Sequence, residues 1–341
     1  MFENIKRELD KGFFIQWPLP KNFLGTVGPL LTILARHPDS IIENVPAYTK
    51  RLNSHRVPWA HIDDEKRYDS ISELKKKFVD KAKSVDNELP DEKYLRPTRF
   101  CESNSLEIRA LAHELRAETE SDIKFVQAAF NWVKNKKYLV FKPISGALQI
   151  FKTKGGVCLD QLSLLTAITR AGGIPARYRL YGLAPTQELY NVMVAPNPII
   201  KETYEALGFL DAMHGEAELM VNGTWIHGDP TFSDELSVGL GIPISELGGE
   251  PGWRVRVPKS GDIRFEGFPV LFRHFFIPLL IILRKTVDDI NDSLDEIREN
   301  GRRILDEISI EEYNKKTKKT FKPTVPSISE VKLFREQIKK E

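Results

Sequence analysis

The sequence predicts an α+β fold in which several helices are followed by an antiparallel sheet. Apolar residues recur at helical spacing in segments 105–115, 123–133 and 159–171, whereas apolar and polar residues alternate with period two over 176–182. Asn222-Gly223 then separates two further strand-like segments and is the strongest short signal for a two-residue hairpin. Helices that precede an antiparallel sheet are expected to pack on one of its faces.

Two amphipathic helices are predicted ahead of the sheet. Ser105 can cap the first, which continues to Leu115, and Ser121 or Asp122 can cap the second. We expect both helices to pack on a third helix that begins at Cys158. Their apolar stripes are Ile108, Leu111, Ala112 and Leu115 in the first, and Ile123, Val126, Phe130 and Val133 in the second.

Cys158 ends the segment Gly155-Gly156-Val157-Cys158 and opens the third helix, Leu159 to Ala171. A helix N-terminus stabilises a thiolate, because unpaired backbone N–H groups and the positive end of the helix dipole favour the anion. Glycines before the cysteine let the chain turn tightly and leave the sulfur accessible. The pattern therefore indicates a nucleophile, although a lone cysteine is more often a buried structural thiol.

The hairpin supplies a base and a residue that orients it. If Asn222-Gly223 forms the turn, Val221 pairs with Thr224, and counting along the ladder places His214 opposite Thr231 and Glu216 opposite Asp229. Side chains alternate between faces, so His214 and Asp229 become diagonal neighbours on one face. A carboxylate bound to one ring nitrogen leaves the other free to take a proton from a thiol. The sequence predicts a Cys158, His214, Asp229 triad.

These segments resemble the transglutaminase-like superfamily, of microbial type, which shares its core with papain-like thiol enzymes. The resemblance rests on residues 155–160, on 164–178, on the His214 strand and on Trp225 to Thr231, and it covers about residues 90 to 235. It implies Cys158 as nucleophile, His214 as general base and acid, and Asp229 as the orienting residue. Members often carry an aromatic residue two positions after the histidine, whereas this chain has Glu216 there, which places a carboxylate beside the proposed base.

The resemblance implies acyl transfer at an amide or ester carbonyl through a thioester. Water as acceptor gives a peptidase, amidase or deamidase, and a lysine amine gives a crosslinking enzyme; microbial relatives favour hydrolysis. An oxyanion hole needs the Cys158 backbone N–H and a second donor, for which Gln149 is a candidate and Tyr138 a rival, while a solvent-facing glutamine is an equal alternative. We expect a protein or peptide substrate and no cofactor; calcium dependence, known in some animal members, has no motif here.

Two other interpretations stay open at the level of sequence. His214, Glu216, His227 and Asp229 have the side chains of a zinc or iron site, but strand spacing alone meets few of its geometric demands, so we expect no metal. His227 pairs with Glu218 across the ladder and is expected to lie at the surface or beside the triad. The alternative function is a catalytically inactive transglutaminase-like scaffold or protein-interaction module that acts through its flanks.

Composition excludes some classes of function. The chain has 341 residues, is 41% hydrophobic and 29% charged, and carries a net charge of +2, which gives no global field to attract nucleic acid or membrane. Two cysteines do not make a disulfide framework, and the first residues lack a signal-peptide core, so we expect a cytoplasmic protein. The apolar segment 268–283 is interrupted by Arg273, His274 and Pro278 and is too short for a membrane span.

The flanks divide into three regions around a catalytic core of residues 91–257. Residues 1–90 read as a mainly helical region, in which a lysine-bearing helix at 70–85 is either a solvated surface or a phosphate-binding face. Residues 258–314 hold the apolar segment and a long amphipathic helix, and residues 315–341 form a mobile basic tail with weak potential for nucleic-acid contact, Lys occupying five positions from Lys315 to Lys322. We expect the helix to pack within the chain, with a homo-oligomer through 287–308 as the alternative. Its apolar positions are Val287, Ile290, Leu294, Ile297, Ile304 and Ile308, with Gly301 filling one slot.

Overall fold

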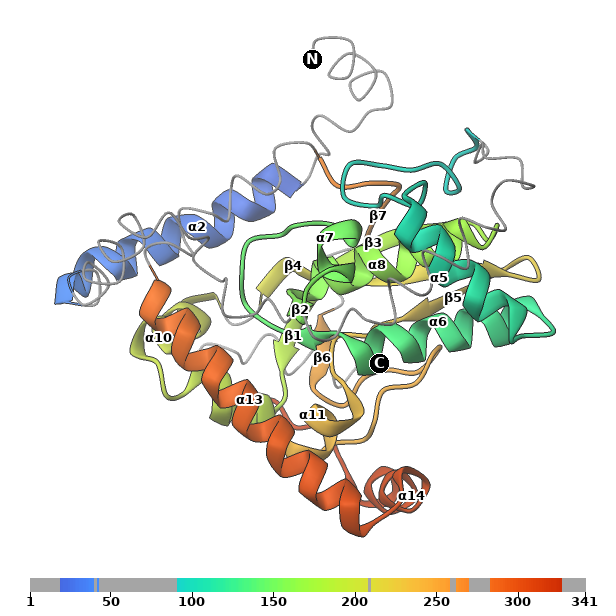
Figure 1. Cartoon of the computed structure of the whole chain (residues 1–341). Coiled ribbons are helices and arrows are strands. Elements are labelled where there is room, and N and C mark those ends of the chain that lie inside the picture. Colours follow the sequence, from blue (N-terminus) through green and yellow to red (C-terminus); the bar gives the residue numbers. More distant parts are fainter. Residues whose placement is uncertain are drawn as a thin grey trace.

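Helix α8 (Cys158–Ala171) lies against an antiparallel sheet and is covered on its other side by helices α5 and α6 (Figure 1). The computed structural model describes residues 19–39, 42, 91–207, 210–257, 262–269 and 283–326. Residues 159–170 of α8 are all buried, as expected of a helix enclosed by other elements. The α+β class and the helical segments at both flanks are confirmed.

The sheet has the strand order β5-β4-β3-β6, and β7 pairs with another part of β3. All of these pairings are antiparallel. Because β7 belongs to this sheet, the sheet extends past residue 257, the expected end of the core. The strands are β3 (Ala176–Pro185), β4 (Leu210–Val221), β5 (Thr224–Gly228), β6 (Arg254–Val257) and β7 (Ile263–Phe265).

The hairpin between β4 and β5 has the predicted register. Val221 pairs with Thr224, and the two turn residues have positive φ angles, 50° at Asn222 and 80° at Gly223, as a type I′ turn requires. The ladder ends at the pair Ala217 and Gly228, so the expected pairs beyond it are not part of the sheet. The chain after Gly228 is free to bring Asp229 toward His214.

The predicted helices α5 (Leu106–Ala117) and α6 (Asp122–Lys136) are present and contact α8. Ser105 and Ser121 occupy the N-cap positions, but neither side chain accepts a capping hydrogen bond. One member of the predicted stripes is wrong: Ile123 is 41% exposed. Phe125 takes its place in the core because α6 turns Phe125, Val126 and Ala129 inward. A short parallel pair, β1 (Tyr138–Leu139) and β2 (Gly155–Gly156), and helix α7 (Ala147–Phe151) precede α8.

The long amphipathic helix is α13 (Arg284–Glu307), and it packs within the chain against α11 (Asp234–Gly239). Contact is very close: a Cβ added at Gly301 would lie 1.8 Å from the carbonyl oxygen of Glu235, and one added at Gly239 would lie 2.0 Å from that of Ile297. Gly301 is therefore a contact point rather than a gap in the stripe. The contact with α11 agrees with the expected packing of this helix within the chain.

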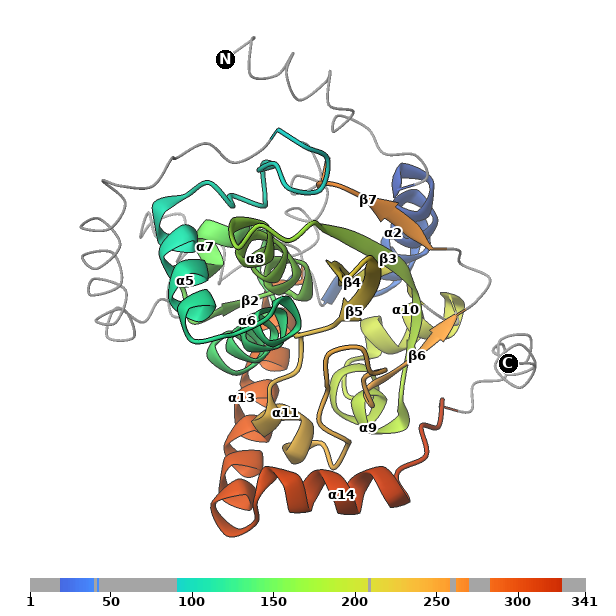
Figure 2. The same ribbon diagram turned by 90° about the vertical axis from the view of Figure 1, so that its right-hand side faces the viewer.

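The basic segment after residue 314 is not a mobile arm over its first part, because Lys315 lies in helix α14 (Ile310–Thr320). Ser309 caps this helix by accepting the N–H of Glu312, and acidic residues in its first turn and lysines in its last turn complement the helix dipole. Lys318 also forms an ion pair with Glu246 at 2.7 Å. Figure 2 shows α13 and α14 meeting at an angle.

Helices α2 and α10 lie on the side of the molecule at the left of Figure 1. The N-terminal helix α2 contacts both α10 and β4. The predicted lysine-bearing helix at 70–85 and most of the apolar segment 268–283 lie outside the described residues. Among the helices that are described, none combines the length and the apolar character needed to cross a bilayer. The remaining elements are α2 (Leu19–Arg36), α9 (Gln187–Leu189), the π-helical turn η3 (Tyr190–Val194) and α10 (Pro198–Leu207).

Candidate active site

Cys158 is the first residue of α8, as predicted, and its side chain is partly exposed. The two glycines before it serve close packing rather than a strained turn. A Cβ at Gly155 would lie 2.1 Å from the carbonyl oxygen of Tyr138, and one at Gly156 would lie 2.6 Å from the Oδ2 atom of Asp160. The β1–β2 pair therefore needs glycine in order to deliver the cysteine to the helix start.

Asp160, in the first turn of α8, is fully buried and holds the segment that lies upstream of the cysteine. Its Oδ1 atom accepts the backbone N–H groups of Ser145 and Gly146 at 2.8 and 2.9 Å. Burial raises the pKa of this carboxyl, while Lys142 and the N–H groups lower it in part. Asp160 thus joins α8 to the 145–146 loop.

His214 and Asp229 are hydrogen-bonded, as the hairpin register predicts. The His214 Nε2 atom lies 2.8 Å from the Asp229 Oδ2 atom, and both side chains are buried. With Nε2 donating to the carboxylate, Nδ1 is left as the basic nitrogen. The other carboxylate oxygen accepts the backbone N–H of Thr231 at 3.1 Å and also the Thr231 hydroxyl. Thr231, whose role the sequence did not reveal, therefore fixes the carboxylate that orients the ring.

Cys158 and His214 line the same cavity, of about 300 Å³. Cys158 enters it from the start of α8 and His214 from strand β4, so two segments 56 positions apart in the chain meet there. The structure thus places Cys158 and His214 in the lining of one cavity. Asp229 is hydrogen-bonded to His214.

The Cys158 thiol is held in its neutral form. Burial raises the pKa of Cys158 and the negative charge of Asp229 raises it further, while the backbone N–H groups of Leu159 and Cys158 act in the opposite direction. The expected effect of the helix N-terminus is therefore present but is outweighed by desolvation. A thiol in this environment reaches the thiolate only when a base such as His214 accepts its proton.

Asp229 is held in its charged form. Burial alone would raise its pKa, but the neighbouring His214 and Arg254 and the hydrogen bond from Thr231 outweigh burial and lower the pKa to about 2. The Arg254 Nε atom lies 3.5 Å from the Asp229 Oδ2 atom, on a side chain that is fully buried. Arg254 thus supplies a positive charge behind the carboxylate.

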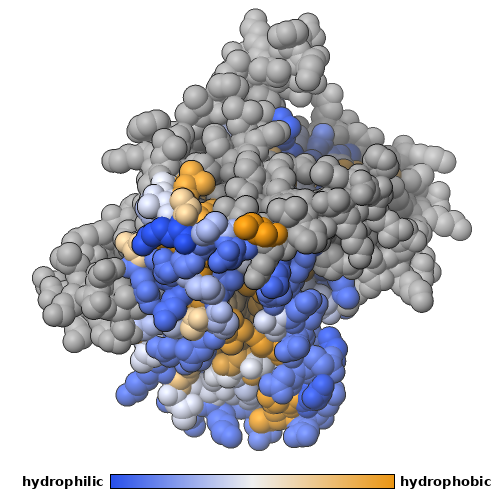
Figure 3. Space-filling view, turned by 90° about the vertical axis from the view of Figure 1, so that its left-hand side faces the viewer, coloured by the Kyte–Doolittle hydropathy of each residue, from blue (hydrophilic) through white to orange (hydrophobic). Residues whose placement is uncertain are grey.

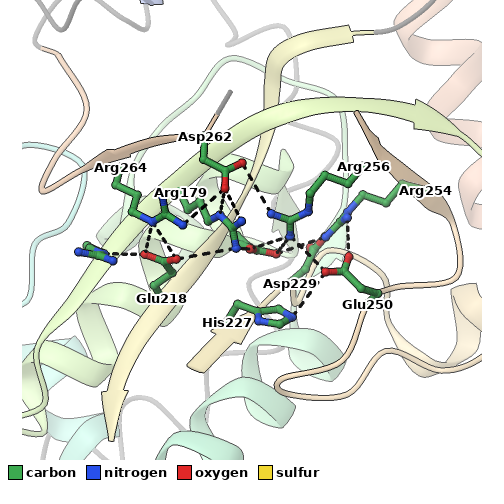
Figure 4. A network of polar contacts seen from close by, with 11 residues as sticks. Arg179, Glu218, His227, Asp229, Glu250, Arg254, Arg256, Asp262 and Arg264 are labelled. Carbon is green, nitrogen blue, oxygen red and sulfur yellow. Dashed lines mark hydrogen bonds and ion pairs between the residues drawn. The ribbon is translucent and has the colours of Figure 1, made fainter. Parts of the chain in front are cut away.

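Glu216, two residues after His214 on β4, is paired with arginines of strands β3 and β6. The carboxylate is fully buried and is surrounded by Arg179, Arg254 and Arg256, at 2.9, 3.3 and 3.0 Å. Figure 4 shows these arginines within a continuous network that reaches Glu218 and Asp262 on one side and Glu250 on the other. The charge of Glu216 is therefore compensated inside the sheet, and Arg254 connects it to Asp229.

Trp253 is the main residue of the site that the sequence did not single out. Its ring meets the His214 ring edge-on, with centroids 4.7 Å apart, and stacks on Phe232 at 4.8 Å. Trp253 lines the cavity and holds the imidazole from one side, while Tyr181 approaches it from another at 5.9 Å. Its only local signal in the sequence is its place directly after the glycine-rich segment 247–252.

The candidates for a second oxyanion donor are not brought to the cavity. Gln149 is exposed on α7 and does not line the cavity, which agrees with its alternative as a solvent-facing glutamine. Tyr138 is also absent from the cavity lining, and its ring lies against the guanidinium of Arg298 at 4.6 Å. The Cys158 backbone N–H, at the open start of α8, is the donor that the position of the helix supports.

The four side chains considered for a metal site do not converge. Glu216 is occupied by arginines, and His227 lies 3.8 Å from Glu250 at the edge of the network, paired across the ladder with Glu218 as predicted. No group of three or more histidine, cysteine or acidic side chains suited to a metal ion occurs among the residues that the structure describes.

Comparison with known proteins gives a family for the part of the chain that carries the site. Residues 109–230 match the model of the "Transglutaminase-like superfamily", and this range contains Cys158, His214 and Asp229. The search of curated proteins gave no match. A crystal structure of a "Putative Cysteine Protease" from Cytophaga hutchinsonii is similar over 55% of this chain and 54% of its own length, with 21% identity and a TM-score of 0.30. Residues 109–230 of this chain are a transglutaminase-like domain.

Proposed function

We propose that this protein is a thiol enzyme that transfers an acyl group from an amide or ester carbonyl to water. Cys158 is the nucleophile, His214 the general base and acid, and Asp229 the residue that orients the imidazole. The observation that carries the proposal is the shared cavity of Cys158 and His214, with His214 bonded to a charged, buried Asp229. The match to a transglutaminase-like domain supports the same assignment.

The reaction follows from the protonation states at the site. As the substrate carbonyl approaches, His214 takes the proton of the Cys158 thiol, and Sγ forms a bond to the carbonyl carbon. The tetrahedral oxyanion is stabilised by the backbone N–H at the start of α8. The bond to the leaving amine or alcohol breaks as His214 returns the proton to it. Water then attacks the thioester, His214 again accepts and returns a proton, and the thiol is restored.

Trapping of the acyl group on Cys158 tests this function. Incubation with 4-nitrophenyl esters should add the acyl mass to the peptide that contains Cys158, and His214→Ala should slow formation of this adduct at least about a thousandfold. Cys101→Ser is the matched control, because Cys101 is fully buried outside the cavity and its loss should leave the adduct unchanged. Acylation that survives Cys158→Ala would disprove the assigned nucleophile.

A second experiment tests whether water or an amine accepts the acyl group from the Cys158 thioester. Adding a primary amine such as cadaverine during turnover measures how the acyl group divides between water and amine. Release mainly as free acid at millimolar amine supports hydrolysis. Release mainly as the amide would identify a crosslinking enzyme and overturn the assignment to water.

An inactive scaffold is the second candidate, and one observation favours it: burial raises the pKa of Cys158, as in a structural thiol. The two candidates differ in the acyl adduct. A scaffold forms no adduct at Cys158 that depends on His214, whereas the proposed enzyme does.

A further inference from the structure

The cavity at Cys158 is apolar almost throughout, and this limits what it binds. Its lining, among the described residues, contains no Asp, Glu, Lys or Arg, and most of its surface comes from aliphatic and aromatic side chains such as Phe141, Leu183, Met193 and Phe232. Placing a charged or amide group there without a partner would cost several kilocalories per mole. The chemistry of the walls therefore selects a hydrocarbon group on the carbonyl that Cys158 attacks.

The flanks of the transglutaminase-like domain build part of this cavity. Leu30 of α2, Trp253 before β6, and Leu283 and Ile290 at the start of α13 line it, and all four lie outside residues 109–230. Leu30 and Leu283 belong to one cluster of apolar side chains, so α2 and α13 close the cavity together. On the face shown in Figure 3, which carries α2, α10 and α13, apolar side chains reach the surface in the middle of hydrophilic ones.

The volume of the cavity favours an acyl chain over an amino-acid side chain as the group bound there. A cavity of about 150 Å³ in an apolar core holds benzene, with six carbons, so about 300 Å³ corresponds to roughly twelve carbons. The largest apolar amino-acid side chains leave part of this volume empty, and empty volume lowers affinity because its walls lose their contacts. A straight chain of about ten carbons beyond the carbonyl fills it.

We propose that the cavity is an acyl-chain site, and that the substrate is an amide or ester of a medium-chain fatty acid. The proposal rests on the proposed function, because it places the substrate carbonyl at Cys158 Sγ and its hydrocarbon chain between α13, α2 and η3. The bond broken is that between the acyl carbon and the leaving nitrogen or oxygen, and the acid released after hydrolysis is the medium-chain fatty acid. The flanking helices thereby determine specificity.

A series of 4-nitrophenyl esters from C2 to C16 tests the proposal on the full chain. We expect kcat/KM to rise about fifteenfold for each two carbons added, because each buried methylene contributes about a fourfold gain, until the chain fills the cavity near C10 to C12. An ester of N-acetylphenylalanine is included to represent an amino-acid side chain. A flat series, or a preference for the phenylalanyl ester over C10, would overturn the acyl-chain site and leave the proposed function standing.

Ile290→Trp tests whether α13 forms the wall. The larger ring shortens the cavity, so the ratio of kcat/KM for C10 over C4 should fall at least tenfold. Asp289→Trp is the matched control, since it adds the same side chain at an exposed position of the same helix outside the lining. Leu30→Trp repeats the test from α2 in case Ile290→Trp unfolds, as judged by circular dichroism. Unchanged selectivity in both folded variants would overturn the assignment.

Binding measured without turnover separates the two proposals. Cys158→Ala should bind N-decanoyl-ethanolamine at least about a hundredfold more tightly than N-butanoyl-ethanolamine in calorimetric titration. If this preference is found while the wild-type protein forms no acyl adduct, the acyl-chain site stands and the proposed function fails. If neither compound binds better than the other, the acyl-chain site fails whatever the protein does to esters.

Discussion

At the scale of single residues, the candidate site combines a thiol whose pKa is raised, Cys158, with a carboxylate whose pKa is lowered, Asp229. Burial raises the pKa of Cys158, whereas Asp229 keeps its charge because His214, Arg254 and Thr231 surround it. Because desolvation favours the neutral form of the Cys158 thiol, we expect its proton to be transferred during the attack itself. Labelling of the thiol by simple alkylating agents consequently reports the burial of Cys158 rather than its competence in catalysis.

The first prediction concerns that alkylation. Because burial raises the pKa of Cys158, the rate of labelling by iodoacetamide should be slow at pH 7 and should still be increasing about tenfold per pH unit at pH 9. Quantitative mass spectrometry of the Cys158 peptide measures the rate. A plateau below pH 8 would show that the thiolate is stabilised at rest and would contradict this account.

The second prediction concerns acid stability. The pKa of Asp229 is about 2 in the folded protein and about 4 in an unfolded chain, so its contribution is present above pH 4 and is lost as the pH falls toward 2. Urea unfolding should show that Asp229→Asn costs about 2 kcal/mol more at pH 6 than at pH 2. Asp292→Asn, which removes an exposed carboxylate from α13, should show no comparable dependence on pH.

At the scale of elements, the sequence predicted the features that neighbouring residues determine, such as the hairpin turn, but not the pairing of distant strands. The Asn222-Gly223 turn fixes the predicted register of β4 and β5, and the His214–Asp229 hydrogen bond forms beyond the last pair of this ladder, Ala217 and Gly228. Trp253 and Arg254 escaped prediction because they reach the site through the pairing of β6 with β3. No short-range signal encodes a pairing between strands so far apart in sequence.

Glu216 also shows that contacts between distant strands are not visible in the local sequence. Its place two residues after His214 suggested an effect on the base, since sequence gives the face of a strand but not the partners that other strands contribute. Arg179 comes from β3, and Arg254 and Arg256 from β6, so the neutralising charges become visible only in the sheet. Gly301, expected only to fill one slot of the stripe, is likewise a contact point because α11 lies against it.

The third prediction tests that helix contact. Alanine normally stabilises a helix relative to glycine by about 1 kcal/mol, but a Cβ at Gly301 would lie 1.8 Å from the Glu235 carbonyl oxygen. Gly301→Ala should therefore lower the free energy of unfolding by about 2 to 3 kcal/mol, because α11 and α13 must separate. Chemical denaturation measures it, with the exposed neighbour Asn300→Ala as a control that is neutral or stabilising. A stabilised Gly301→Ala protein would contradict the close contact.

At the scale of the whole molecule, helix α13 holds part of the wall of the candidate site. The Asn291 side chain of α13 accepts the backbone N–H of Phe141 at 2.7 Å and donates to its carbonyl at 3.1 Å. Arg298 donates to the carbonyl of Leu139 at 3.2 Å. Leu139 and Phe141 both line the cavity, so α13 fixes a wall that begins well before Cys158 in the sequence. The family match ends at residue 230, but the site does not.

The fourth prediction follows from this attachment. Asn291→Ala removes both hydrogen bonds to Phe141 and should lower the free energy of unfolding by about 1 to 3 kcal/mol. Hydrogen exchange should become faster at the Phe141 amide, far from the substitution in sequence. Asp292→Ala, at an exposed position of the same turn, is the control. Unchanged protection of Phe141 in Asn291→Ala would show that α13 does not hold this wall.

The link between Phe141 and Asn291 spans 150 positions of the chain, and it has a consequence for biosynthesis. A ribosome releases the segment bearing the thiol, the imidazole and the carboxylate long before it releases α13. During that interval Cys158, His214 and Asp229 have been synthesised, but the cavity wall that α13 contributes is missing. The cavity beside Cys158 is therefore complete only after α13 has emerged and has packed on Leu139 and Phe141.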